Sequence, residues 1–182
     1  MHWFFIINPE SGKQRAKKIW PSMADALTAA GISFDYAFTE HPKHASSLCS
    51  QALLEGTRQF VAVGGDGTLN EVLQAICAND ALLAQCTLTC FPVGTGNDWA
   101  NWQGIPKDPA AFAEFLQQAP SKNYDIGQVY YGPNYQDRHA FINMFGTGFD
   151  SYLLQEMGPA KGQRLNYYWH LRRQFRNDHV HR

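Results

Sequence analysis

The chain has 182 residues, of which 45% are hydrophobic and 17% are charged, and its formal net charge is −1. This composition is typical of a globular protein and excludes a disordered one. The small net charge gives no electrostatic case for nucleic-acid binding. The four cysteines lack the paired spacing of a zinc site, so we expect buried thiols in a reducing compartment.

Apolar residues predict strands and helices that alternate through the first two thirds of the chain. Strands are predicted at 3–7, 33–38, 60–63 and 88–92, and helices at 13–30, 44–55, 68–78 and 109–118. Pro21 lies inside the first helix and predicts a kink there or a later start. The alternation predicts an α/β fold, a Rossmann-like parallel sheet with helices on both faces.

The pattern changes after residue 121. Segments 124–131 and 139–145 predict an antiparallel pair of strands, and 165–175 predicts a basic, aromatic helix. That helix either packs on another domain or contacts the inner membrane surface peripherally. No apolar run is long enough to span a membrane, and the first residues lack the basic leader of a signal peptide, so we expect a cytoplasmic protein.

A glycine-rich turn, Gly64-Gly65-Asp66-Gly67-Thr68, joins a predicted buried strand to a helix. Such glycines let the backbone approach a ligand, and the amide groups of the turn and helix start form an anion site. Asp66 would repel a bare phosphate, so it indicates Mg²⁺ or a hydrogen bond to the carboxylate. The structural alternative is a tight turn capped by Asp66. We expect Thr68 and Asn70 to donate to phosphate or ribose, and Glu71 to bind ribose or hold the loop.

Three other segments follow predicted strands. Pro92–Asp98 is a second glycine-rich turn, Asn8–Lys13 follows the first strand, and Thr39 ends the second. The carboxyl ends of parallel strands lie at one edge of the sheet, where such folds bind ligands. The sequence therefore predicts a nucleotide-phosphate site at this edge.

The motifs as a set resemble the diacylglycerol kinase catalytic domain, a family that includes sphingosine, ceramide and bacterial lipid kinases. The resemblance rests on Asn8-Pro9-x-Ser11-Gly12, Gly64-Gly65-Asp66-Gly67-Thr68-Leu69-Asn70-Glu71-Val72, Pro92-x-Gly94-Thr95-Gly96-Asn97-Asp98-Trp99-Ala100, Asp125-Ile126-Gly127 and Phe141-x-Asn143-x-x-Gly146-x-Gly148-x-Asp150. It covers roughly residues 3–175. NAD kinases share the first glycine-rich loop but lack the second pattern.

The resemblance implies an ATP- and Mg²⁺-dependent kinase that transfers the γ-phosphate to the hydroxyl of a diacylglycerol-like lipid. It implies that Asp66 is catalytic and organises Mg²⁺, directly or through water. The implied nucleotide contacts are Asn8, Pro9, Ser11, Gly12, Thr39, Gly64, Gly65, Asp66, Gly67, Thr68, Leu69, Asn70, Glu71 and Thr95.

The same resemblance predicts how the chain is organised. Residues 1–150 would form the ATP-binding α/β domain and residues 151–182 a helical connection. Members of this family continue into a C-terminal β-sandwich domain that carries the proposed general base, and we expect that domain to be missing from this chain. We therefore expect the isolated chain to bind ATP but to be a poor kinase, and we expect open sheet edges to favour self-association. Two alternatives are a nucleotide-binding fragment and an NAD-kinase-like enzyme with a soluble substrate.

Overall fold

The computed structural model describes residues 1–118 and 121–146. Residues 1–143 form one compact unit. The predicted connection 151–182, its helix at 165–175, and motif residues Gly148 and Asp150 lie outside the described residues. The elements are β1 (His2–Ile7), α1 (Ser11–Ala29), β2 (Ser33–Phe38), α2 (His44–Leu54), β3 (Gln59–Gly64), α3 (Asp66–Cys77), α4 (Asp80–Leu83), β4 (Thr87–Pro92), α5 (Asp98–Trp102), α6 (Pro109–Gln118), β5 (Gly127–Tyr131), η1 (Pro133–Tyr135) and β6 (Asp137–Phe141).

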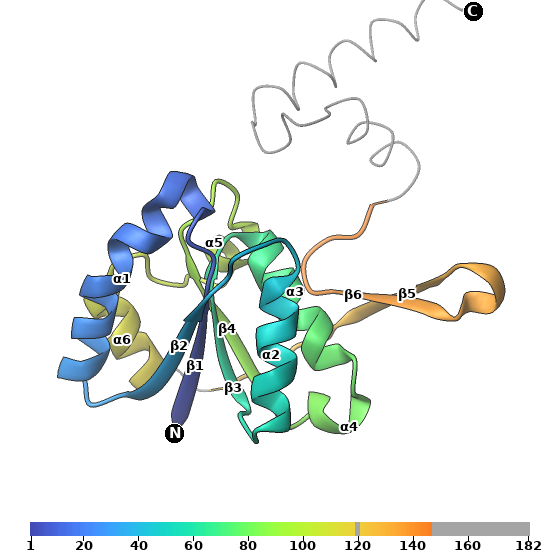
Figure 1. Ribbon diagram of the computed structural model, residues 1–182, viewed down its shortest axis with the longest axis horizontal. Coiled ribbons are helices and arrows are strands. Elements are labelled where there is room, and N and C mark those ends of the chain that lie inside the picture. Colours follow the sequence, from blue (N-terminus) through green and yellow to red (C-terminus); the bar gives the residue numbers. More distant parts are fainter. Residues whose placement is uncertain (119–120, 147–182) are drawn as a thin grey trace, which may run out of the picture. The chain divides into compact units, whose positions relative to one another are not determined.

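Four parallel strands form a sheet in the order β2-β1-β3-β4. Helices α1 and α6 pack together on one face, and α2 and α3 pack together on the other (Figure 1). The predicted α/β fold with helices on both faces is thus confirmed. The order reverses between β1 and β3, which makes the carboxyl ends of these two strands the topological switch point of the sheet.

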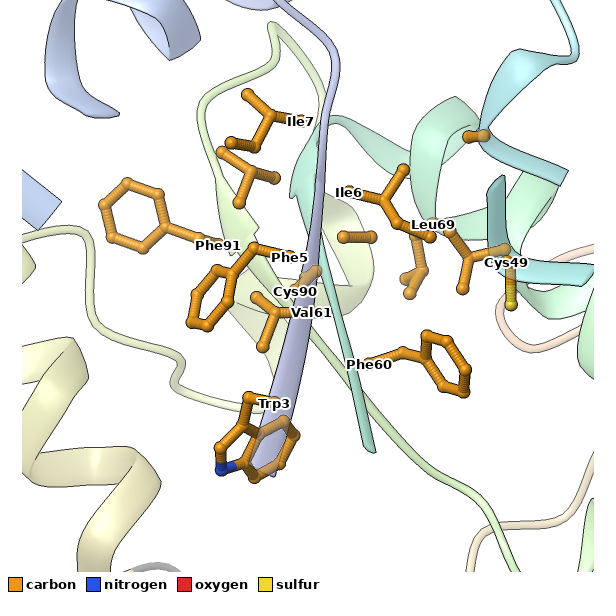
Figure 2. Packing of buried hydrophobic residues seen from close by; sticks show 14 of the residues in the cluster. Trp3, Phe5, Ile6, Ile7, Cys49, Phe60, Val61, Leu69, Cys90 and Phe91 are labelled. Carbon is orange, nitrogen blue, oxygen red and sulfur yellow. The ribbon is translucent and has the colours of Figure 1, made fainter. Parts of the chain in front are cut away.

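The central strands are buried on both faces, which explains their unbroken apolar runs. Phe5 and Ile6 are neighbours in β1 and point to opposite faces of the sheet (Figure 2), and both are fully buried. Phe60 and Val61 of β3 are also fully buried. Burying each such side chain contributes about 1.5–3 kcal/mol. The packed sheet therefore fixes the ends of the strands from which the glycine-rich loops emerge.

Helix α1 differs from its prediction. Its irregular backbone lies at Gly12, Lys13 and Gln14, which have left-handed dihedral angles, and it continues through Pro21 with helical angles. Pro21 therefore causes no kink, and the regular helix starts after Gln14, later than the predicted start at residue 13. The buried side chains of Trp20 and Met23 flank the proline and hold the helix against the core, so packing outweighs the lost hydrogen bond.

The two strands predicted after residue 121 form an antiparallel hairpin, β5–β6, in which Gly127 pairs with Phe141. A side chain at Gly127 would collide with the ring of Phe141. The prediction of an antiparallel pair is confirmed. The short helix α4 was not predicted; the side chain of Asn79 caps it by accepting a hydrogen bond from the amide of Ala81 at 3.1 Å.

Buried thiols predict a loss of stability in alkaline solution. Burial raises the pKa of Cys49 and of Cys90 to about 12, against about 9 for an ordinary thiol. The unfolded chain therefore loses these protons first, and the free energy of unfolding should fall between about pH 9 and 12. We expect about 1.4 kcal/mol per pH unit for each thiol.

Urea denaturation at several pH values would measure this slope. The double variant Cys49→Ala, Cys90→Ala should show a shallower alkaline slope than the wild type. Equal slopes would mean that other groups cause the alkaline loss.

Candidate functional site

Three loops meet in direct contact at the carboxyl edge of the sheet. The side-chain amide of Asn8 donates to the hydroxyl of Thr68 at 3.3 Å, which joins the first loop to the second. Gly12 has a φ of +62°, and a side chain there would collide with the carbonyl of Val93, so the first loop also lies against the third. These contacts place the predicted segments in one continuous surface.

The second and third loops touch through their backbones. A β-carbon on Gly65 would lie 3.3 Å from the α-carbon of Gly94, which is closer than most side chains tolerate. A side chain at Gly64 would collide with Thr68. Packing within the protein therefore explains why glycine occupies positions 64 and 65.

Gly67 is different from its neighbours. It is exposed, it has no positive φ, and an added β-carbon would have no heavy atom within 4 Å. It is the second residue of α3, where backbone amides lack intrahelical partners and favour anions. The fold does not require glycine here, whereas a ligand lying directly on the backbone would.

Asp66 links the second loop to helix α5. Its Oδ2 atom accepts hydrogen bonds from the backbone amides of Asn97 at 2.9 Å and Asp98 at 3.0 Å. The carboxylate thus accepts hydrogen bonds from the first backbone amides of α5. In α3, the helix to which Asp66 itself belongs, the N-cap position is occupied by Gly65. The sequence predicted that Asp66 either binds Mg²⁺ or accepts a hydrogen bond. The structure shows the accepted hydrogen bonds.

The side chain of Asn97 forms hydrogen bonds across the third loop. Asn97 was not among the site residues predicted from the sequence. It is buried, with a φ of +76°, and its amide donates to the carbonyl of Gly94 at 2.7 Å. Its Oδ1 also accepts from the amide of Gly94 at 3.1 Å. An asparagine after a glycine-rich turn is the available sequence signal, since asparagine tolerates left-handed angles and bonds nearby backbone.

Replacing Asn97 should therefore destabilise the protein. Asn97→Ala loses both side-chain hydrogen bonds and places alanine at a left-handed position, so we expect unfolding to become easier by about 2–3 kcal/mol. Urea denaturation would measure this. Asn97→Gly keeps the backbone geometry and should recover part of the loss; an Asn97→Ala variant of wild-type stability would contradict the assigned role.

Other predicted contacts on α3 are turned toward the protein. Leu69 is 1% exposed and lies in the core, and Thr68 is 5% exposed. Glu71 accepts a hydrogen bond from the backbone amide of Lys43 at 3.2 Å, so it holds the loop after β2. Thr68 and Leu69 therefore offer little exposed area to a ligand at the surface.

Asn70 is turned toward the hairpin. Its Oδ1 accepts from the side-chain amide of Gln74 at 2.9 Å, and its Nδ2 lies 3.3 Å from Nε2 of His139. Of its two Nδ2 hydrogens, one is used in that contact, which leaves a single donor for a phosphate. His139 and Gln74 had no motif in the sequence that marked them.

The remaining predicted contacts lie around the same edge. The amide of Thr39 donates to the carbonyl of Ile7 at 2.8 Å, which keeps Thr39 beside the first loop. Pro9 and Ser11 are half-buried in that loop, and Thr95 is exposed in the third. These residues lie in the segments that follow β1, β2 and β4.

Residues 1–118 and 121–146 contain neither a helix suited to cross a membrane nor a cluster of metal-ligating side chains. In this part of the chain no helix has the length and apolar character needed to cross a membrane. Nor does any group of three or more His, Cys, Asp and Glu side chains come together there in a way that could hold a metal ion.

Comparison with known sequences identifies the family. The pattern of the diacylglycerol kinase catalytic domain matches residues 2–129. The chain belongs to this family. It is 30% identical over 156 residues to "Putative lipid kinase YtlR" of Bacillus subtilis, an alignment covering 84% of this chain and 49% of that protein. It is 33% identical over 140 residues to "Probable lipid kinase YegS-like" of Pseudomonas fluorescens, covering 77% of this chain and 43% of that protein.

Solved structures of the same kind share the fold. A diacylglycerol kinase from Bacillus anthracis superposes with a TM-score of 0.65 at 22% identity, over 87% of this chain and 51% of that one. A second B. anthracis structure, titled a putative diacylglycerol kinase, gives a TM-score of 0.59 at 23% identity, over 69% and 42%. The chain spans about half the length of the relatives that it matches.

Proposed function

We propose that this chain is the nucleotide-binding part of a lipid kinase that transfers the γ-phosphate of ATP to a lipid hydroxyl. The observation that carries the proposal is Gly67. It is an exposed glycine without a structural need for glycine, at the start of a helix and between Asp66 and Thr68, which contact the third and first loops. Phosphate groups bind at such helix starts through backbone amides. Family membership supports the kinase class of the reaction.

The residues at the site fit a Mg²⁺ ion that arrives with ATP. Mg²⁺ is commonly held by one or two carboxylates together with the phosphates of the nucleotide, rather than by a full set of protein ligands. Asp66 is half-buried beside the proposed phosphate position and would supply such a carboxylate, directly or through water. The ion would neutralise charge on the phosphates.

A hollow of about 460 Å³ offers a place for the acceptor. It lies at the base of the hairpin, and aromatic and amide or carboxylate side chains form its walls. Its lining residues are Trp102, Asn123, Tyr124, Asp125, Gly127, Phe141, Ile142 and Asn143. Trp102 belongs to α5, whose first amides are held by Asp66. We assign the head group of the lipid to this hollow.

Transfer of radiolabel from γ-labelled ATP would test the proposal. The purified chain is incubated with Mg²⁺ and, in separate reactions, with diacylglycerol in mixed micelles, with NAD and with no acceptor. Label in the lipid, even at a low rate, is the expected result. Label in NAD would favour the soluble-substrate alternative, and ATP binding without any transfer would favour a nucleotide-binding role alone.

A further inference from the structure

Three consecutive residues of β6 are bonded to helix α3. At the centre, the side chain of Gln74 donates from Nε2 to the carbonyl of Ala140 at 2.7 Å and accepts at Oε1 from the amide of Ala140 at 2.9 Å. One carboxamide therefore supplies both bonds that a neighbouring strand would give to this residue. The backbone of β6 is held to the helix by this pair.

Arg138 makes a second set of contacts between β6 and the end of α3. It donates to the carbonyls of Cys77 at 2.7 Å and Ala78 at 2.9 Å, and it forms an ion pair with Asp80 at 3.0 Å. These carbonyls end helix α3, where a cation is favoured by the helix dipole. His139 adds the 3.3 Å contact with Asn70 nearer the start of the helix. Strand β6 is thus bonded to α3 at three places along the helix, at Asn70, at Gln74 and at the C-terminal end.

The apolar part of this junction is small. It consists of the buried side chains of Leu73, Cys77 and Ala140, with partly buried neighbours that include Ile126 and Ile142. A two-stranded hairpin is marginally stable in water without further packing. The polar contacts are therefore needed to keep the hairpin in one position on α3.

Helix α3 connects two functional regions. Its first turn carries Gly67 in the proposed phosphate site, and its later turns hold the hairpin that supplies Gly127 and Phe141 to the proposed acceptor hollow. A helix of 12 residues is about 18 Å long and behaves as a rigid rod over that distance. The position of the hairpin along α3 consequently sets the distance between the two regions.

We propose that Gln74 is a positioning residue, which fixes the acceptor side of the site relative to the phosphate loop through its two bonds to Ala140. The inference rests on the proposed kinase function. Misplacing reacting groups by about 1 Å costs on the order of 100-fold in rate. Loss of Gln74 should therefore slow transfer far more than it weakens the binding of ATP, because Asn70 would lose the partner of its Oδ1 atom but keep its own donor.

The test compares Gln74→Ala with wild type and with Gln51→Ala. Both variants replace a glutamine inside a helix by alanine, a better helix former. The side chain of Gln51 is exposed and donates to Glu55 at the end of α2, so Gln51→Ala serves as the control. Hydrogen–deuterium exchange is followed at residues 64–70 and 127–141, together with the dissociation constant of ATP and the rate and KM of transfer.

We expect Gln74→Ala to speed exchange in the hairpin at least tenfold and to lower the transfer rate about 10- to 100-fold. Exchange at residues 64–70, the ATP dissociation constant and the KM for ATP should stay within twofold of wild type. Hairpin exchange equal to that of Gln51→Ala would overturn the inference, as would faster hairpin exchange with an unchanged transfer rate. A wild-type chain that fails to bind ATP would instead refute the proposed function itself.

Discussion

Replacing Gly67 by alanine should weaken ATP binding at least tenfold without destabilising the protein. The added β-carbon meets no heavy atom within 4 Å in the free protein, so the fold accepts it. Alanine inside a helix is favoured over glycine by about 0.5–1 kcal/mol, so the melting temperature should stay constant or rise. The methyl group would occupy the space that a phosphate needs, and a tenfold loss corresponds to about 1.4 kcal/mol.

Isothermal titration calorimetry and thermal denaturation would measure the two effects of Gly67→Ala. Ser47→Ala, an exposed change in the neighbouring helix α2, should alter neither. Gly94→Ala provides a contrast, because its side chain would collide with the backbone of Gly65 and should lower stability and binding together. Wild-type ATP affinity in Gly67→Ala would remove the main support for the phosphate site.

Asp66→Ala should lose both stability and the binding of Mg²⁺–ATP. The variant removes two hydrogen bonds to a charged acceptor, each worth about 1.5–3 kcal/mol in similar cases, and so frees the start of α5. Because Asn97 and Asp98 would lose their acceptor, the third loop should no longer pack on the second. Denaturation with urea and titration with ATP would show the two losses.

Asp66→Asn separates the structural role of the carboxylate from a role toward Mg²⁺. The amide oxygen still accepts from both backbone groups, so most of the stability should return. An amide is a poorer ligand for Mg²⁺ than a carboxylate. We therefore expect the variant to lose the gain in ATP affinity that Mg²⁺ gives the wild type. If Mg²⁺ strengthens ATP binding equally in both proteins, Asp66 acts only by holding α5.

The sequence was sufficient to predict the parallel sheet and the edge of the sheet at which the site lies. Unbroken apolar strands separated by amphipathic helices allow few arrangements other than a parallel sheet with two covered faces. Because each glycine-rich or polar segment directly follows a strand, the common edge follows from the strand direction alone. The contacts Asn8–Thr68 and Gly12–Val93 agree with this placement.

The sequence alone did not predict which residue each side chain contacts. Asp66 bonds to residues about thirty positions away, and this contact depends on β3 and β4 being neighbours in the sheet. The difference between Gly64 and Gly67 lies in the surrounding atoms and not in the local pattern. Gln74 lies in an ordinary helical stretch, and its bonds to Ala140 arise only when the hairpin folds back on α3.

The most direct test of the account is an amide nuclear magnetic resonance titration of the wild-type chain with Mg²⁺–ATP. We expect the largest shift changes at Gly12, at residues 65–68 and at residues 94–96, with small changes at the hairpin tip. In Gly67→Ala these changes should be much smaller than in the wild type at an ATP concentration near the wild-type dissociation constant. Absence of any change at residues 65–68, or changes confined to a different face of the sheet, would contradict the proposed nucleotide site.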